Sequence, residues 1–128
     1  MMEISDEDVE RFYAFGFAHY GAGNWSEAAR VFQVLCTRRP LEPKYWFALG
    51  ATLQEGKSYE DALHSWAMAA LLKKGDPYPH FHAAECCISL EMKEDAAKAL
   101  GESEVRILSV EEHPLRDKID LLRRQWGL

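Results

Sequence analysis

Three aromatic residues recur in this sequence at a constant interval. Tyr13, Phe47 and Phe81 are separated from one another by 34 residues. If each stands at the same place in a repeated structural unit, their rings form a regular row of flat apolar surfaces. A row of this kind suits the binding of an extended peptide with apolar anchors. The alternative is that the rings pack between the repeats and contact no ligand.

Further aromatic and polar residues fall in the slots beside this row. They include Phe17, Tyr20, Gln54 and Glu85. The Gln54 amide would offer hydrogen bonds to a peptide backbone. Lys44 is the single cation in these slots, so the surface suits an apolar peptide better than an acidic tail.

Histidine and cysteine residues also lie close together near position 80. His82 and Cys86 are four residues apart on one expected helical face, with His80 and Glu85 nearby. Two ligands do not make a zinc site, and we interpret these residues as structural. The sequence shows no phosphate-binding glycine loop, nucleophile elbow or acid pair with tuned acidities. We therefore expect no enzyme, no metal and no cofactor.

The elements that position these residues follow from the same 34-residue interval. Small residues, acids and large apolar residues recur in register in four columns: Ala28, Ala62 and Ala96; Gly16, Gly50 and Ala84; Phe32, Trp66 and Leu100; Glu27, Asp61 and Asp95. This period and these residue types are typical of tetratricopeptide repeats, in which antiparallel helix pairs stack on one another. An unrelated helical bundle that aligns by chance is the alternative.

The repeats predict an all-α fold with one domain over residues 1–128. We place the repeats at about 9–42, 43–76 and 77–110, in a right-handed superhelix, with an amphipathic capping helix over about 113–126. The third repeat is degenerate, because His80 replaces the tryptophan found at Trp46.

Several local contacts are also expected. Ser5 should cap the first helix, and Ser58 with Asp61 should form a capping box. Gly16 should face Ala28 across the first helix pair. The residues expected on the same face as Gly16, toward the second helix, are Phe12, Phe15 and His19.

Composition and charge exclude several classes of function. The net charge is -6, which argues against a nucleic-acid partner. The three cysteines are an odd number and give no disulfide framework. No apolar run approaches the ~20 residues of a membrane span, and the acidic N-terminus does not resemble a signal peptide. We expect a protein that stays in the cytoplasm and does not bind membranes.

Two stretches resemble a known family. They are Tyr45 to Gln54, and the segment Asp76-Pro77 followed by Phe-His-Ala-Ala-Glu-Cys at 81–86. Both are similar to the class II chaperones of bacterial type III secretion, the SycD/LcrH/IpgC family. The resemblance covers about Phe12 to Leu100.

The resemblance implies a chaperone of the bacterial cytoplasm that serves virulence by keeping a hydrophobic translocator soluble and unassembled before export. A client segment of the P-x-L-x-x-P type would lie in the concave groove. The implied contact residues are Tyr13, Phe17, Tyr20, Tyr45, Phe47, Gln54, Phe81 and Glu85. A homodimer remains open, although the short segment before Phe12 argues against the family's mode of homodimerisation.

Two other functions remain open. One is a co-chaperone of the needle subunit, which would hold a helical client in a ternary complex. The other is a general tetratricopeptide scaffold or regulator.

Overall fold

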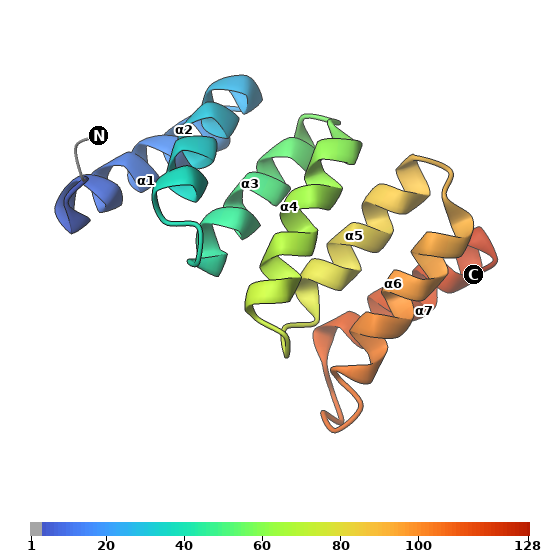
Figure 1. The fold of residues 1–128 in the computed structure, drawn as a ribbon. Helices are drawn as coiled ribbons and strands as arrows, with labels where there is room; N and C mark the ends of the chain where they lie inside the picture. Colours follow the sequence, from blue (N-terminus) through green and yellow to red (C-terminus); the bar gives the residue numbers. More distant parts are fainter. Residues whose placement is uncertain (1–3) are drawn as a thin grey trace.

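The fold is all-α, with three antiparallel helix pairs and a final helix (Figure 1). The computed structural model describes residues 4–128. Within them the chain forms seven helices: α1 (Asp6–Gly21), α2 (Trp25–Arg38), α3 (Pro43–Glu55), α4 (Tyr59–Leu72), α5 (Tyr78–Ser89), α6 (Lys93–Val105) and α7 (Pro114–Trp126). Each helix packs against the next one in the sequence. The predicted stack of three tetratricopeptide repeats with a capping helix is therefore confirmed.

Close approach within the first two pairs depends on glycine. A Cβ built on Gly16 would lie 2.7 Å from an atom of the Phe32 ring, and one built on Gly50 would lie 2.8 Å from the Trp66 ring. Both rings are fully buried. Gly16 was expected to face Ala28, and the atoms nearest its Cβ position belong to Phe32, one turn further along α2, and to Val31. The glycines make room for an aromatic side chain of the second helix.

The helix ends are capped less uniformly than the sequence indicated. Ser5 Oγ accepts a hydrogen bond from the Asp8 backbone N–H at 3.1 Å, as expected for α1. Asn24 and Ser58 precede α2 and α4, but neither side chain makes a capping hydrogen bond. The capping box predicted at Ser58 and Asp61 is therefore absent, since the Ser58 side chain does not bond to the first turn.

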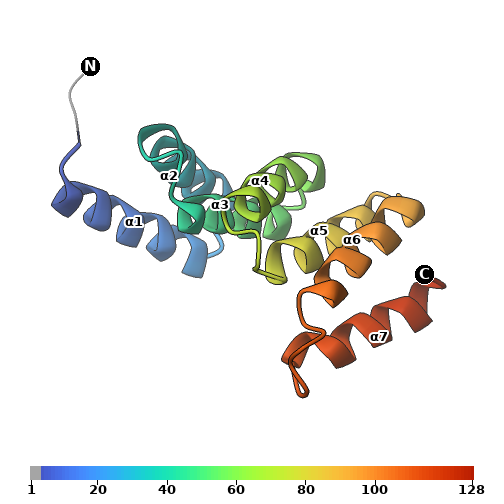
Figure 2. The ribbon, with the colours of Figure 1, turned by 60° about the horizontal axis from the view of Figure 1, so that its bottom comes forward.

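Helix α7 covers the end of the stack that α5 and α6 would otherwise expose. Leu115 and Ile119 are buried in one core cluster with Leu100 and Ile107. The Arg116 guanidinium donates to the carbonyls of Ile107 and Val110 and so holds the preceding loop. Figure 2 shows α1 and α7 at opposite ends of the stack.

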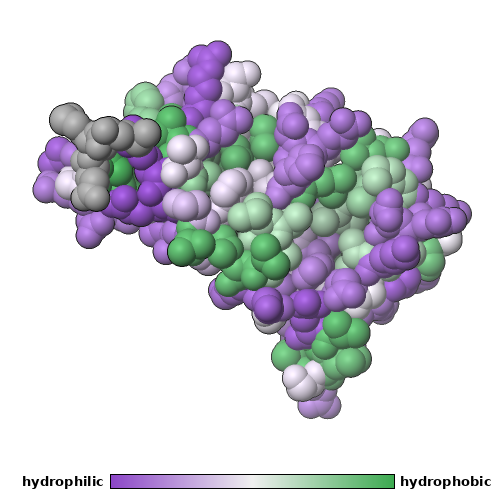
Figure 3. Space-filling view, in the orientation of Figure 1, coloured by the Kyte–Doolittle hydropathy of each residue, from purple (hydrophilic) through white to green (hydrophobic). Residues whose placement is uncertain are grey.

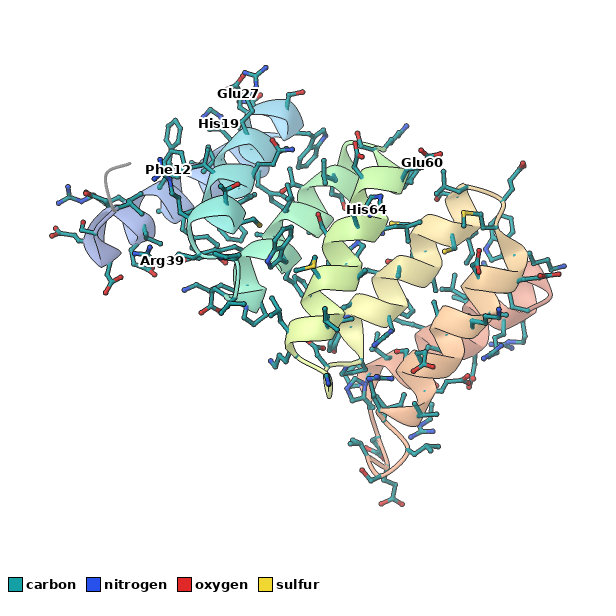
Figure 4. All side chains as sticks on the ribbon, viewed as in Figure 1. Phe12, His19, Glu27, Arg39, Glu60 and His64 are labelled. Carbon is teal, nitrogen blue, oxygen red and sulfur yellow. The ribbon has the colours of Figure 1, made fainter. Side chains whose placement is uncertain are left out.

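The outer side of α1 differs from its prediction. Phe15 was expected to face α2, but its side chain is 54% exposed. Its ring stacks on Phe12 and meets the edge of His19, with centroids 6.4 and 4.6 Å away. Figure 4 shows Phe12 and His19 on the same side of α1.

Across residues 4–128, no helix has both the length and the apolar character needed to span a bilayer.

Candidate functional site

The first and third helices line an open cavity of about 620 Å³, which we call the concave groove. The end of α4 and the start of α5 complete its wall. The lining is mostly aromatic and small apolar, with four charged residues. The lining residues are Tyr13, Phe17, Tyr20, Glu42, Pro43, Lys44, Phe47, Ala48, Ala51, Ala69, Lys73, Asp76 and Tyr78.

Helix α1 supplies three of the predicted aromatic residues. Phe17 is 42% exposed, while Tyr13 and Tyr20 are half-buried. The Phe17 ring meets the rings of Tyr13, Tyr20 and Phe32 at centroid distances of 4.8, 6.0 and 5.3 Å. Because Phe32 is fully buried, it fixes this aromatic wall against α2. The sequence therefore placed Tyr13, Phe17 and Tyr20 together correctly.

Phe47 forms the facing wall from α3. Its ring is half-buried and meets Trp66 of α4 edge to face, with centroids 4.7 Å apart. Trp66 can lie at that depth only because Gly50 has no side chain. The position of Phe47 thus depends on the glycine column of the sequence.

A lysine and two tyrosines form a cluster at the junction of α1 and α3. Lys44 Nζ lies 5.2 Å from the centroid of the Tyr13 ring, 5.4 Å from that of Tyr45 and 3.4 Å from Glu10 Oε1. Burial raises the pKa of both tyrosines, which keeps their phenols protonated at neutral pH. Tyr45 is 3% exposed and does not line the groove, so it supports Tyr13 from below.

The position of Phe81 contradicts the predicted row of three exposed rings. Its side chain is 5% exposed and packs with Leu100, Leu115 and Ile119 beneath α7. It therefore does not line the groove. Helix α5 contributes Tyr78 instead, which sequence reasoning missed. Tyr78 lies 34 residues after Lys44, so the repeat column of Lys44 could have identified it.

Gln54 and Glu85 lie outside the groove lining and bond to each other. Trp66 Nε1 donates to Gln54 Oε1 at 2.9 Å, and Gln54 Nε2 donates to Glu85 Oε1 at 3.1 Å. Glu85 Oε1 also lies 2.7 Å from His82 Nδ1. The Gln54 amide that we expected to face a peptide backbone is thus engaged in a network joining α3, α4 and α5.

Four charged residues border the groove, of which sequence reasoning had considered only Lys44. Asp76 Oδ1 accepts from the Tyr78 N–H at 2.9 Å, and Glu42 Oε1 accepts from the Lys44 N–H at 3.4 Å. Both acids lie at helix N-termini, where the helix dipole stabilises negative charge. Lys73 and Lys44 balance them. The groove is therefore apolar with a neutral border.

His82 and Cys86, which are spaced as a pair of metal ligands would be, make other contacts in the structure. His82 bonds to Glu85, and its ring stacks on Trp66 with centroids 4.7 Å apart. Cys86 is fully buried, and burial raises the pKa of its thiol to about 12. Over residues 4–128 the structure brings together no group of three metal-ligating side chains. What the groove can do is hold an extended, mainly apolar segment.

Stacked helix pairs with an open aromatic groove define a protein of the tetratricopeptide class. The family description "Tetratricopeptide repeat" matches residues 43–76. "Low calcium response locus protein H" of Yersinia pestis is 35% identical over 86 residues, which are 67% of this chain and 51% of that protein. "Chaperone protein SicA" of Salmonella typhimurium is 30% identical over 115 residues, which are 90% of this chain and 68% of that protein.

A solved structure supports the same relationship. The chaperone SycD of Yersinia enterocolitica, in complex with a peptide of the translocator YopD, matches with a TM-score of 0.82 at 26% identity, covering 98% of this chain and 93% of that chain. The chain belongs to the LcrH/SycD/SicA family of class II type III secretion chaperones. It spans about half the length of the Low calcium response locus proteins that it matches.

Proposed function

We propose that this chain is a type III secretion chaperone that holds an extended segment of a hydrophobic translocator in the concave groove. The observation that carries the proposal is the open groove between the aromatic walls of α1 and α3. SicA is named a chaperone, and SycD has been solved with a translocator peptide. By binding alone, with no chemical step, the chain would keep its client soluble in the bacterial cytoplasm before export.

The groove suits a short segment with proline and leucine anchors. Phe17 and Phe47 offer half-exposed rings against which such side chains can pack. Burying one leucine side chain contributes about 1.5–3 kcal/mol. The protonated phenol of Tyr13 can donate a hydrogen bond to a peptide carbonyl. A segment of the P-x-L-x-x-P type has this chemistry, because proline also reduces the entropy lost on binding.

The contact set that we propose follows the geometry. Tyr13, Phe17, Tyr20 and Phe47 contact the client directly. Tyr45 and Phe81 support these rings or the core beneath them, and Gln54 with Glu85 holds Trp66 behind Phe47.

Two substitutions in the groove test the proposal against a matched control. Phe17→Ala and Phe47→Ala should each weaken binding of the client segment by about 1–3 kcal/mol, or roughly 5- to 150-fold. Phe15→Ala removes a ring that is more exposed than Phe17, 54% against 42%, and that lies outside the groove, so it should change affinity less than about twofold. Calorimetry with a client peptide gives the affinities, and circular dichroism melting checks the fold.

The outcomes are distinct. If both groove variants bind the client peptide with wild-type affinity, the groove is not the client-binding site. An equal loss of affinity in Phe15→Ala would show that aromatic rings on both sides of α1 contribute to binding, so that the site is not confined to the groove.

A further inference from the structure

A second hollow lies between α4 and α5, and we call it the α4–α5 trough. Its volume is about 510 Å³. It is lined by Leu63, Trp66, Ala67, Ala70, Leu71, Lys74, Pro79, His80, Ala83 and Arg106. None of these residues lines the concave groove. In Figure 3 the surface over the middle of the molecule, where α4 and α5 lie, is largely pale to green.

At the position of His80 in the wall of the trough, the second repeat has a larger side chain. Trp46 packs against the first core cluster, and its Nε1 donates to the Pro40 carbonyl at 2.8 Å. The residue 34 positions later is His80, whose ring is smaller. The carbonyl 34 positions after Pro40 is that of Lys74, and it accepts from Arg106 Nε at 2.6 Å.

His80 is therefore left without the bond that its counterpart makes. Its Nε2 atom is buried and has no hydrogen-bond partner among residues 4–128. An indole fills the equivalent space in the second repeat, so a large aromatic side chain from outside would fit the trough.

The wall of the trough on α4 is more apolar than the equivalent face of α2. Leu71 is 63% exposed, and Ala67 precedes it by one turn. The residues 34 positions earlier are Thr37 and Gln33, which are polar and exposed. An exposed apolar stripe where the neighbouring repeat is polar is typical of a surface that another protein covers. The stripe from Leu63 to Leu71 extends about 12 Å along α4.

Positive charge lies at one end of the stripe. Lys74 and Arg106 both line the trough, and Glu102 offsets part of the charge through its 2.8 Å bond to Arg106. In the described part of the chain, no carboxylate pairs with the Lys74 ammonium or with Arg106 Nη2. An acidic side chain would complement this end.

We propose that the α4–α5 trough is a second docking surface, which takes an amphipathic helix of a partner protein. The helix inserts one large aromatic side chain over His80 and sets carboxylates against Lys74 and Arg106. Small residues at Ala67, Ala70 and Ala83 let its backbone approach closely. The surface is independent of the concave groove, because the two use different sides of α4: Ala69 and Lys73 face the groove, whereas Ala70 and Lys74 face the trough.

Two synthetic helices test the proposal with the full chain. Each is locked by a side-chain bridge and carries one tryptophan and two leucines on one face. The first has two glutamates beyond the tryptophan, and the second has lysines there. Methyl NMR spectra of the protein locate the contact and give affinities. We expect the glutamate helix to shift the methyl signals of Leu63, Ala67, Ala70, Leu71 and Ala83, and to bind about tenfold more tightly than the lysine helix.

Three variants sharpen the test. His80→Trp fills the trough from within, as Trp46 does in the second repeat, and should weaken the glutamate helix about tenfold. Leu71→Glu changes an exposed residue, so the fold is retained, and it should weaken binding by a similar factor. Thr37→Glu is the control at the equivalent place on α2 and should change affinity less than about twofold.

Each outcome decides the matter. The proposal is overturned if the glutamate helix shifts no methyl signal of the trough at millimolar concentration, or if Thr37→Glu weakens it as much as Leu71→Glu. Shifts confined to Ala48, Ala51 and Ala69 would also overturn it, while supporting binding in the concave groove.

Discussion

Gly50→Ala tests how closely α3 and α4 pack. The new Cβ would lie 2.8 Å from two atoms of the Trp66 ring, well inside van der Waals contact. Trp66 has little freedom to move, because it is 1% exposed and its Nε1 bonds to Gln54. His82 stacks on one face of the indole, and Phe47 meets it edge to face. The methyl group must therefore push the helices apart or break these contacts.

The expected loss follows from two opposing effects. Overpacking a core of this kind costs about 1–3 kcal/mol. Replacing glycine by alanine inside a helix returns about 0.5–1 kcal/mol. These ranges give a net destabilisation of up to about 2.5 kcal/mol, with a midpoint of about 1 kcal/mol that lowers the Tm by roughly 3–5 °C for a chain of this size.

Thermal melting followed by circular dichroism measures this effect. Gly101→Ala in α6 is the matched control, because nothing lies within 4 Å of its Cβ position. It should stabilise the protein by about 0.5–1 kcal/mol. If Gly50→Ala melts at or above the wild-type temperature, the close approach of α3 and α4 does not require glycine, and the reasoning fails.

Two further predictions concern the third repeat. Phe81→Ala should cost about 3–5 kcal/mol in urea unfolding, because its ring is enclosed beneath α7; a cost below about 1 kcal/mol would contradict that burial. Burial and, secondarily, the nearby Arg106 lower the pKa of His80. The unfolded chain then binds the proton more readily, so stability should fall as the pH drops below about 6.5. Unfolding free energies measured from pH 7.5 to 5 should show a shallower slope for His80→Gln, and equal slopes would rule out this role.

The periodicity of the sequence predicted the parts of the structure that depend on neighbouring helices. Gly16 and Gly50 marked the seams within the pairs, and Tyr13, Phe17 and Phe47 were correctly placed on the groove. These positions repeat because each pair of helices meets the next in the same way. The side chain that lies over each glycine was not predicted, since a column of residue types does not specify which atoms touch.

Phe81 shows where this reasoning fails. It occupies the same repeat position as Tyr13 and Phe47, but α7 packs against α5 and encloses it. The last repeat has a different neighbour, which periodicity cannot reveal. The predicted orientation of the Gln54 amide was wrong for another reason. Its spacing placed Gln54 beside the groove, but hydrogen bonds to Trp66 and Glu85 turn its amide inward.

The hydrogen-bonded chain from Trp66 through Gln54 to Glu85 and His82 also bears on how the stack can bend. Flexing between the second and third pairs would stretch directional bonds in a partly buried setting. Between the first and second pairs, a shared apolar core joins α1, α2 and α3, and the contacts of Tyr13 with Tyr45 and of Lys44 with Glu10 add to it. The two junctions thus resist bending in different ways: directional hydrogen bonds oppose it between the second and third pairs, and apolar packing opposes it between the first and second.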